Sequence, residues 1–463
     1  MSTYMEDTIA AISTALSPAG IAVIRISGPQ AVAAADRIFV SPVGKKLQNQ
    51  PANTIHYGMI AEADQPEKTI DEVLVMLMRA PHSFTGEDVV EIDCHGGILA
   101  ARSVLEAVLR TGVRPAEPGE FTKRAFLNGR IDLSQAEAVM DVISAKNNYA
   151  LQSSVRQLKG SLSEKIEKIR QTLLHETAFI EAALDDPEHI DMEGHLEELQ
   201  STVTQAQADI QNLIASADAG AMMKEGIKTV IVGRPNAGKS SLLNALTGEE
   251  TAIVTEIAGT TRDVLEDQVN LGGITLRLLD TAGIRQSDDK IEQIGIARAR
   301  SHAEDADLIL YVVDGSETLD ENDSEIMQLI KGRKALILLN KSDLKQMVSP
   351  EDIQTNTDCK IIEISAKNQT GMQELENCIK EMFYSGKLTQ NDEVYITNIR
   401  HRRALEESSQ SLAFVLEGIK NNMPEDFLSI DLMAACESLG KITGRSVGED
   451  LINEIFSGFC LGK

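Results

Sequence analysis

The chain has no long hydrophobic run. Among its 463 residues, no apolar stretch approaches the roughly 20 residues that a membrane-spanning helix needs. The first residues, Met1-Ser-Thr-Tyr-Met-Glu-Asp7, are polar and do not resemble a secretory signal peptide. We therefore expect no membrane segment and a cytoplasmic location.

Cysteine is also scarce. There are five cysteines, and none of them forms a C-x-x-C pair: Cys94, Cys359, Cys378, Cys436 and Cys460. An odd number of scattered cysteines argues against a disulfide framework and against a zinc site, and it favours a reducing compartment.

Positive charge is in short supply, with 44 Lys and Arg against 71 Asp and Glu and a formal net charge of −27. Such a surface repels nucleic acid, so a nucleic-acid partner would need a local basic patch or an adaptor protein. The best patch is Arg400-His401-Arg402-Arg403, and secondary candidates are Lys123, Arg124 and Arg130. An equally good interpretation of the patch is a solvated helix start balanced by Glu406 and Glu407.

The hydrophobic pattern divides this long chain, whose length suggests about three domains. Up to about residue 120 it is mixed, with strands expected at 21–26, 72–78 and 89–94 and a helix at 99–110. From 134 to about 219 the spacing is helical, broken only at Gly160, Pro187 and Gly194. The segment 181–199 carries eight carboxylates without Lys or Arg, which indicates a solvated helix–turn–helix junction.

Strands and helices alternate from Gly226 to about Phe383, which predicts a doubly wound α/β domain. Its strands are expected at 229–232, 275–279, 308–313, 335–339 and 360–364. Helices are expected again at 401–420, 426–439 and 446–455. Because this tail is short for a core of its own, we expect the α/β domain to be inserted into one discontinuous helical domain.

A glycine-rich loop lies in the middle of the chain. Gly233-Arg-Pro-Asn-Ala-Gly-Lys-Ser240 has the spacing G-x-x-x-x-G-K-S, with an apolar run before it and a helical pattern after it. Backbone N–H groups of such a loop and the helix N-terminus bind phosphate oxygens. Lys239 is expected to reach the β- and γ-phosphates, and the Ser240 hydroxyl to ligate Mg²⁺. The residues predicted to bind the nucleotide here are Asn236, Ala237, Gly238, Lys239, Ser240 and Ser241.

Three further motifs follow later strands of this region. Asp280-Thr-Ala-Gly283 places a carboxylate near Mg²⁺ and a backbone N–H near the γ-phosphate. Asn340-Lys-Ser-Asp343 offers an aspartate that accepts from guanine N1–H and the exocyclic amine, and Ser365-Ala-Lys367 completes the base pocket. Together the motifs predict a GTPase that contacts its nucleotide through Asp280, Thr281, Ala282, Gly283, Asn340, Lys341, Asp343, Ser365, Ala366 and Lys367.

The segment between the loop and these motifs contains Gly259-Thr-Thr-Arg-Asp263, in which Thr261 is the expected ligand of Mg²⁺ and the γ-phosphate. Ile284 stands where Ras-like enzymes carry the Gln that orients the attacking water. Isoleucine cannot orient water. Hydrolysis therefore needs another group, either further along the segment that follows Asp280-Thr-Ala-Gly283 or supplied on association.

The motifs of the α/β part occur together with distinctive segments in the rest of the chain. In the α/β part these are Asn236, 259–263, Asp280-Thr-Ala-Gly-Ile-Arg285 and Glu292-Gln-Ile-Gly-Ile296. Outside it they are 119–128, 132–137 and Cys460-Leu-Gly-Lys463. With them the chain resembles the bacterial tRNA-modification GTPase family MnmE (TrmE) over its whole length. The resemblance implies a multidomain fold of α/β and all-α parts. It comprises an N-terminal α+β folate-binding and dimerisation domain, a discontinuous helical domain and an inserted Ras-like P-loop G domain. The corresponding bounds are 1–120, then 121–222 and 385–463 for the two helical parts, and 223–384 for the G domain.

The resemblance also implies an activity and partners. The family forms a homodimer and joins the FAD- and NADH-using protein MnmG in a heterotetramer. Together they add a carboxymethylaminomethyl or aminomethyl group to C5 of the wobble uridine of certain tRNAs. The carbon comes from methylene- or formyl-tetrahydrofolate.

A potassium ion is implied next to the P-loop when two G domains pair. Its ligands by resemblance are Asn236, Thr255, Ile257 and Thr260, of which Thr255 and Thr260 also lie at the nucleotide. Glu292 would replace the missing Gln and orient the water through a second water. Asn236 also occurs in P-loops that bind no K⁺, and Glu292 alone is compatible with an exposed helix-face charge.

The folate site and the role of the C-terminal cysteine are likewise implied by the resemblance. The matching folate residues are Arg25, Glu87, Arg130 and Lys463; some relatives have Lys in place of Arg130, which keeps the charge but changes its geometry. Salt-bridge or surface roles are the alternative for these residues. Cys460, which alone would be taken as an inert semi-buried residue, is given a role in the modification by the resemblance, with Lys463 able to lower its thiol pKa.

Two other classes of function compete. A regulatory GTPase switch, for example in ribosome assembly, shares the Gly-Thr-Thr-Arg-Asp motif but usually adds a basic RNA-binding module, whereas this chain is acidic. A purely structural scaffold conflicts with intact Mg²⁺ and guanine motifs.

Overall fold

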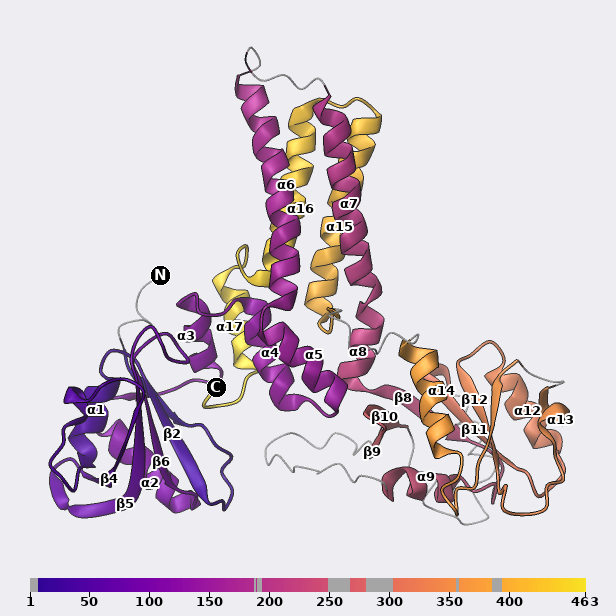
Figure 1. Ribbon diagram of the computed structural model, residues 1–463, viewed down its shortest axis with the longest axis horizontal. Coiled ribbons are helices and arrows are strands. Elements are labelled where there is room, and N and C mark those ends of the chain that lie inside the picture. Colours follow the sequence, from indigo (N-terminus) through magenta and orange to yellow (C-terminus); the bar gives the residue numbers. More distant parts are fainter. Residues whose placement is uncertain are drawn as a thin grey trace. The chain divides into compact units, whose positions relative to one another are not determined.

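The computed structural model describes residues 7–186, 189, 194–248, 267–279, 303–354, 358–384 and 394–463. The chain divides into two compact units, each assembled from segments that are distant in the sequence (Figure 1). Unit 1 comprises residues 1–140, 157–191 and 429–463, and unit 2 comprises residues 141–156 and 192–428. The four domain bounds expected from the sequence stay a prediction.

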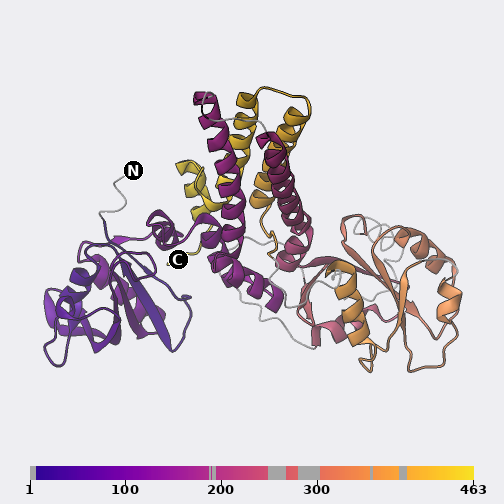
Figure 2. The same ribbon diagram turned by 45° about the horizontal axis from the view of Figure 1, so that its top comes forward.

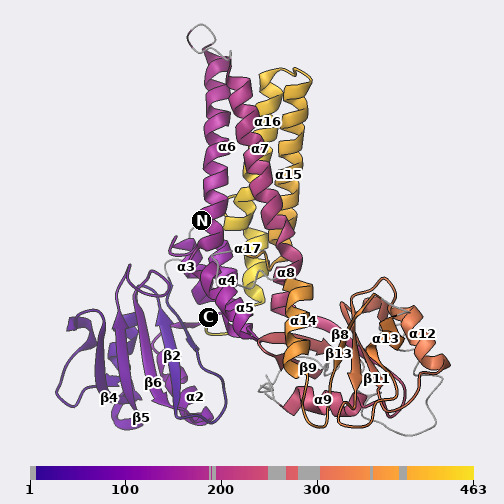
Figure 3. The same cartoon turned by 45° about the vertical axis from the view of Figure 1, so that its right-hand side comes forward.

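A seven-stranded sheet with the order β3-β4-β5-β6-β2-β1-β7 forms the N-terminal part of unit 1. Its strands are β1 (Ile9–Ile12), β2 (Ile21–Ser27), β3 (Phe39–Val40), β4 (Thr54–Glu62), β5 (Gln65–Met78), β6 (Val89–His95) and β7 (Arg114–Pro115). In β2 the buried residues Ala22, Ile24 and Ile26 alternate with more exposed ones, as expected for a sheet with one covered face. That face packs against the helices α1 (Ala31–Ile38) and α2 (Ile98–Leu109) in one hydrophobic core. Figure 1 labels both helices, and Figure 3 shows α2 beside the sheet.

Helices make up the rest of unit 1. They are α3 (Glu120–Leu127), α4 (Leu133–Ser144), α6 (Ser161–Asp185), α16 (Glu425–Thr443) and α17 (Glu449–Ser457), of which α4 and α16 extend past the bounds of the unit. Phe456 and Phe459 pack on Leu133 and Ala136, so the helices near the C-terminal end share a core with those that follow the sheet.

The last residues of the sequence lie on the N-terminal part of unit 1. The backbone N–H groups of Gly119 and Phe121, at the start of α3, donate to the carbonyl oxygens of Cys460 and Lys463 at 3.3 and 3.2 Å. Gly462 has a φ of +89°, and a Cβ there would lie 2.4 Å from the carbonyl oxygen of Ile12. Only glycine fits this approach of the chain to β1.

Unit 2 contains a six-stranded sheet with the order β13-β12-β11-β8-β10-β9, parallel except for β9. Its strands are β8 (Ile227–Val232), β9 (Asp267–Leu271), β10 (Ile274–Leu278), β11 (Leu308–Asp314), β12 (Ala335–Asn340) and β13 (Lys360–Glu363). The helices around it are α9 (Lys239–Gly248), α12 (Glu321–Ile330), α13 (Pro350–Gln354) and α14 (Met372–Tyr384). Every residue of β11 and β12 is buried, because cores lie on both faces of the sheet.

The other helices of unit 2 flank this sheet in the sequence: α5 (Asn148–Leu158), α7 (His195–Ala215), α8 (Ala217–Glu225) and α15 (Ile399–Lys420). Helices α7 and α15 run side by side (Figures 1 and 2), and Gln211 Nε2 on α7 donates to Ser409 Oγ on α15 at 2.7 Å. Asn147 Nδ2 donates to Met223 O at 3.1 Å and to Thr275 Oγ1 at 2.9 Å. Asn147 thus joins the segment before α5 to α8 and to the α/β sheet.

The structure agrees with most elements expected from the pattern. The helical stretch after residue 134 breaks at Gly160 and before Gly194, and the α/β part stands in sequence between two helical parts. The strands β1, β3, β4, β7 and β9, the helix α1 and the break between α4 and α5 were not expected. No helix within the described ranges combines the length and apolar character needed to cross a bilayer.

Candidate functional site

The glycine-rich loop between β8 and α9 depends on backbone conformations that side chains disfavour. Gly233 has a φ of +152° and Gly238 a φ of +100°; a Cβ on them would lie 2.3 Å from Val312 O and 2.1 Å from Asn340 Nδ2, respectively. Asn236 lies in the left-handed region with a φ of +61°, which asparagine tolerates better than most residues. The motif's spacing is therefore set by close packing of the loop on β11 and β12.

Lys239 is the first residue of α9, and its ammonium turns back onto the loop. Its Nζ donates to the carbonyl oxygens of Gly233 and Arg234, both at 2.6 Å. Burial lowers its pKa to about 8. Ser240 and Ser241 follow in the first helical turn and are exposed, as is Asn236, whereas Ala237 is buried.

Asn340, at the end of β12, connects three loops. Its Nδ2 donates to Ala237 O in the glycine-rich loop at 2.9 Å, and its Oδ1 accepts from the backbone N–H of Ala366 at 3.0 Å. Asn340 is 2% exposed, so these hydrogen bonds are shielded from water. The structure thus brings the glycine-rich loop together with the predicted base-binding segments 340–343 and 365–367.

The base-binding segments carry one well-oriented carboxylate. Ser365 Oγ donates to Asp343 Oδ1 at 2.6 Å, and this hydrogen bond, with smaller contributions from Lys367 and Lys341, lowers the pKa of Asp343. Lys341, whose φ is +65°, pairs with Asp314 at the end of β11. Asp343 and Lys367 are exposed and remain accessible to a base.

Arg234, in the glycine-rich loop, is held by carboxylates at the start of α12. Its side chain is 10% exposed, and it lies 3.1 Å from both Asp320 Oδ2 and Asp323 Oδ2. Asp320 and Asp323 form the capping box of α12, and Asp323 Oδ1 also accepts from the hydroxyl of Tyr311 at 2.7 Å. Tyr311 on β11 is the strand partner of Val232 on β8, the residue before the loop. The network therefore connects the start of the loop to α12 and to β11.

A second cluster lies in unit 1, around the ring of Phe84. The guanidinium carbon of Arg25 is 5.1 Å from the centre of this ring and that of Arg130 is 5.4 Å from it, within the range of a cation–π interaction. Arg130 Nη1 also donates to Phe84 O at 2.8 Å. Arg25 pairs with Glu91 at 2.7 Å.

The C-terminal segment joins this cluster. Arg25 Nη1 donates to Gly462 O at 3.4 Å, and burial together with the charge of Arg25 lowers the pKa of Lys463. Cys460 is exposed, so the interpretation of it as a semi-buried inert residue is not supported. The predicted residues Arg25, Arg130 and Lys463 therefore converge although they are far apart in the sequence.

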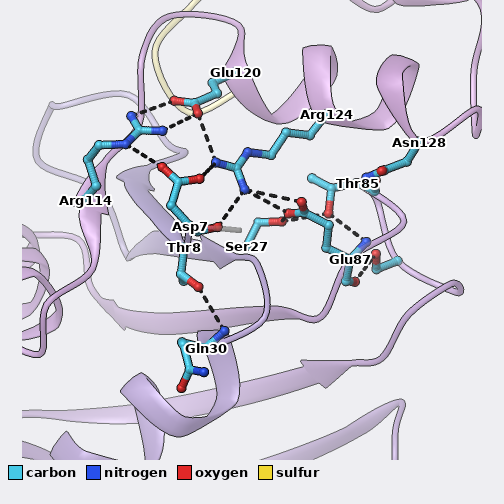
Figure 4. A network of polar contacts seen from close by, with 11 residues as sticks. Asp7, Thr8, Ser27, Gln30, Thr85, Glu87, Arg114, Glu120, Arg124 and Asn128 are labelled. Atoms are coloured by element: carbon cyan, nitrogen blue, oxygen red, sulfur yellow. Dashed lines mark hydrogen bonds and ion pairs between the residues drawn. The ribbon is translucent and has the colours of Figure 1, made fainter. Parts of the chain in front are cut away.

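Glu87, three residues after Phe84 in the sequence, belongs to a polar network of the same unit (Figure 4). Its carboxylate accepts from Ser27 Oγ at 2.7 Å and from Arg124 Nη1 at 3.3 Å. Arg124 also binds Asp7 and Glu120, at 2.6 and 3.1 Å from its Nη2. Although burial favours the neutral acids, hydrogen bonds from Arg114 and Arg124 hold the pKa values of Asp7 and Glu120 below their usual range.

Comparison with known proteins covers both parts of the chain. Residues 8–130 match the family described as GTP-binding protein TrmE N-terminus, and residues 133–460 match the MnmE helical domain. The protein named tRNA modification GTPase MnmE from Lachnoclostridium phytofermentans is 55% identical over 99% of both chains. The chain belongs to the MnmE family. A second MnmE, from Alkaliphilus metalliredigens, is 46% identical over 99% of this chain and 100% of its own.

This membership confirms the predicted family and the predicted fold class of the chain. Among solved structures, the FeoB G-domain from Methanococcus jannaschii is 25% identical over 34% of this chain and 97% of its own, with a TM-score of 0.26. That score is too low to bear on the fold.

Part of the site expected for an MnmE lies outside the described residues: Thr255, Ile257, Thr260, Thr261, Asp280, Thr281, Ala282, Gly283 and Glu292. Their roles stay predictions. The described part of the nucleotide site is the glycine-rich loop with segments 340–343 and 365–367.

The basic residues considered for nucleic acid differ in their surroundings. Arg124 is 3% exposed and enclosed by carboxylates, so its prediction as a surface contact for nucleic acid is wrong. Arg402 pairs with Asp218 and Glu406 at 2.8 and 2.9 Å, which favours the solvated helix-start interpretation for this residue. His401 is fully buried.

Sequence reasoning missed Phe84, Ser27 and the structural roles of Arg124 and Arg234. The spacing of Glu120 and Arg124, four residues apart on one helix, was a local signal for one ion pair. The partners Asp7 and Glu87 left no such signal, because they lie 117 and 37 residues from Arg124.

Proposed function

We propose that the chain is a GTPase that acts in tRNA modification. The observation that carries this proposal is the position of Asn340, which links the glycine-rich loop to the base-binding segments at the carboxyl ends of β8, β12 and β13. Ligands of parallel α/β sheets bind at this edge. The full-length relatives named tRNA modification GTPase support the tRNA part.

The reaction is GTP + H₂O → GDP + phosphate. Lys239 binds the β- and γ-phosphates, and Asp343 selects guanine by accepting from its N1–H and amino group. Ser240, exposed at the start of α9, and Thr261 hold Mg²⁺, which neutralises charge that develops on the phosphoryl group.

Potassium is proposed as a second cation of the nucleotide site. The side chain of Asn236 is exposed, and its amide oxygen is a suitable hard ligand for such an ion. Thr255, Ile257 and Thr260 complete the ligand set when two G domains pair. Glu292 orients the attacking water in place of the missing Gln.

The cluster around Phe84 is proposed to bind a methylene- or formyl-tetrahydrofolate. Arg25, Arg130 and Lys463 supply cations for the glutamyl tail, and Glu87 accepts from the donors of the pterin amide edge. Cys460, exposed near this cluster, takes part in the modification of C5 of the wobble uridine. The reaction requires MnmG, which brings FAD and NADH, and a cytoplasmic location belongs to the same proposal.

A homodimer is proposed through the sheet of unit 1. On the face opposite α1 and α2, strand pairing places Ile55, Tyr57, Leu74 and Ile21, which are 60, 52, 43 and 59% exposed. Large apolar side chains gathered on one open sheet face are typical of an interface. A second copy of this face would cover them.

Nucleoside analysis of tRNA tests the modification. In cells that lack this protein, the modified wobble uridine is expected to disappear and to return with the wild-type gene. Cys460→Ser is expected to leave GTP turnover intact but not to restore the nucleoside, whereas Cys359→Ser, at a half-buried cysteine of the α/β part, restores it. An unchanged wobble uridine pool in the deleted strain would instead support the regulatory switch.

Turnover in different salts tests the potassium site. At equal ionic strength, GTP hydrolysis is expected to be much faster in KCl than in NaCl. Asn236→Lys is expected to bind nucleotide but to lose the difference between the salts. Equal wild-type rates in both salts would exclude the potassium ion, and a variant still stimulated by KCl would place it elsewhere.

A further inference from the structure

The Glu87 carboxylate accepts hydrogen bonds from two side chains. Arg124 Nη1 lies 3.3 Å from both of its oxygens, and Ser27 Oγ donates to Oε2 at 2.7 Å. The backbone around Glu87 is held too, because Ser83 Oγ donates to Glu87 O at 2.6 Å and Thr85 Oγ1 accepts from Glu87 N at 3.2 Å. The carboxylate is therefore oriented by the protein itself.

Arg124 is placed to act on Glu87 rather than on a ligand. Its side chain is 4% exposed and is surrounded by three carboxylates, those of Asp7, Glu87 and Glu120 (Figure 4). Nη1 donates to Asp7 O at 3.0 Å as well as to Glu87, while Nη2 serves Asp7 Oδ1 and Glu120 Oε1. Such a planar fork reaches several acceptors at fixed angles, which a lysine ammonium does not reproduce.

Glu87 keeps acceptor capacity beyond these hydrogen bonds. Its side chain is 13% exposed, and among the described residues Oε1 accepts from Arg124 alone. A carboxylate offers about four lone-pair positions. The amide edge of a pterin presents two neighbouring N–H donors, which match a carboxylate whose two oxygens are fixed in one plane.

We propose that Arg124 is a positioning residue of the folate site, which fixes the Glu87 carboxylate and balances its charge so that both oxygens are presented to the pterin. The inference rests on the proposed function, in which Glu87 binds the folate. Arg114 provides a matched control, because it binds Asp7 and Glu120 at 2.8 and 2.6 Å but makes no contact with Glu87 in the described network.

The test is calorimetric titration of the full chain with formyl-tetrahydrofolate. Arg124→Lys is expected to weaken binding about tenfold, the loss of one hydrogen bond to a charged group. Arg114→Lys is expected to leave the affinity unchanged even if it lowers the melting temperature. In a Glu87→Gln background, Arg124→Lys is expected to have no further effect on affinity, because a positioning residue acts only through Glu87.

Each outcome of these titrations either supports or overturns the proposed role of Arg124. If the wild-type chain does not bind, the folate site is wrong and the inference falls with it. If the wild type binds and Arg124→Lys binds equally well, the inference alone is overturned. An equal loss with and without Glu87 would also overturn it, since Arg124 would then act on the ligand or on the whole unit.

A milder variant covers the case in which Arg124→Lys does not fold. Ser27→Ala removes the other side-chain donor to Glu87 and leaves the ion pairs intact. It is expected to weaken folate binding several-fold in the wild-type background and not in the Glu87→Gln background. Unchanged affinity in Ser27→Ala would contradict the view that the held geometry of Glu87 matters.

Discussion

Removal of the guanidinium of Arg234 is expected to destabilise the nucleotide-binding part of the chain. In Arg234→Met the apolar stem is kept, but Asp323 loses the Nε–H that lies 3.1 Å from its Oδ2. Asp323 is 1% exposed, and among the described residues it keeps the Tyr311 hydroxyl and the backbone N–H of Asp320 as donors. A buried carboxylate would thus lose its cation.

The magnitude follows from this burial. Removing one member of a buried ion pair costs about 3–5 kcal/mol, and the two remaining donors place the expected loss near the lower end, about 3 kcal/mol. Arg402→Met is the control, because Arg402 also pairs with two carboxylates but at an exposed position. Loss of the Arg402 guanidinium is expected to leave the free energy of unfolding unchanged within error.

Urea unfolding of the full chain, followed by far-ultraviolet circular dichroism with and without GDP, measures this effect. A chain of several domains does not unfold in one two-state step, so the relevant transition is the one that GDP moves to higher urea. Arg234→Met is expected to shift this transition to lower urea, and a second change, Asp323→Asn, to recover part of the loss. An unshifted midpoint would refute the assignment of Arg234 to a buried ion pair.

Three further outcomes are expected at the nucleotide site. Because burial holds the pKa of Lys239 at about 8 and phosphate favours its charged form, nucleotide binding takes up an increasing fraction of a proton between roughly pH 7 and pH 9. Calorimetry in buffers of different ionisation enthalpy measures that uptake, and no buffer dependence would contradict the pKa. Gly238→Ala, whose Cβ would lie 2.1 Å from Asn340 Nδ2, weakens GDP binding by roughly 100-fold, while Gly248→Ala, with open space around it, does not. Asp343→Asn is expected to change the preferred base from guanine to xanthine, because the asparagine amide donates to the O2 atom that stands in xanthine where guanine has its amino group. Competition assays with both triphosphates measure this preference, and an unchanged preference would show that Asp343 does not contact the base.

Local patterns explain why much of the α/β part could be predicted. Strands β11 and β12 are continuous apolar runs because both faces of a parallel sheet are buried. Gly238 is required because a Cβ there would lie 2.1 Å from Asn340 Nδ2, and the spacing of the motif places a glycine at this position. The short strand β1 has only four residues, and its place in the sheet is set by pairing with β2 and β7, which periodicity does not reveal.

The surroundings of Arg124 and Phe84 in unit 1 could not be predicted from local sequence patterns. Arg124 carries the same sequence signal as an exposed helical arginine. Its burial follows from the approach of Asp7 and Glu87, which come from other parts of unit 1. Phe84 was missed for the same reason, since the cations that flank its ring come from β2 and from the segment after α3.

The N-terminal part of the sheet in unit 1 depends on a segment that is made much later than the sheet itself. Ser13 Oγ donates to Gly462 O at 3.0 Å, and the two residues are 449 positions apart. At the usual pace of translation, about 5–20 residues per second, Ser13 waits about 20–90 s before its partner has been made. The α/β sheet of unit 2 is completed within that interval, while the start of α3 and the Ile12 carbonyl still lack the segment that covers them. All strands of the nucleotide-binding half are therefore made before the segment around Gly462, on which the half that contains Lys463 depends.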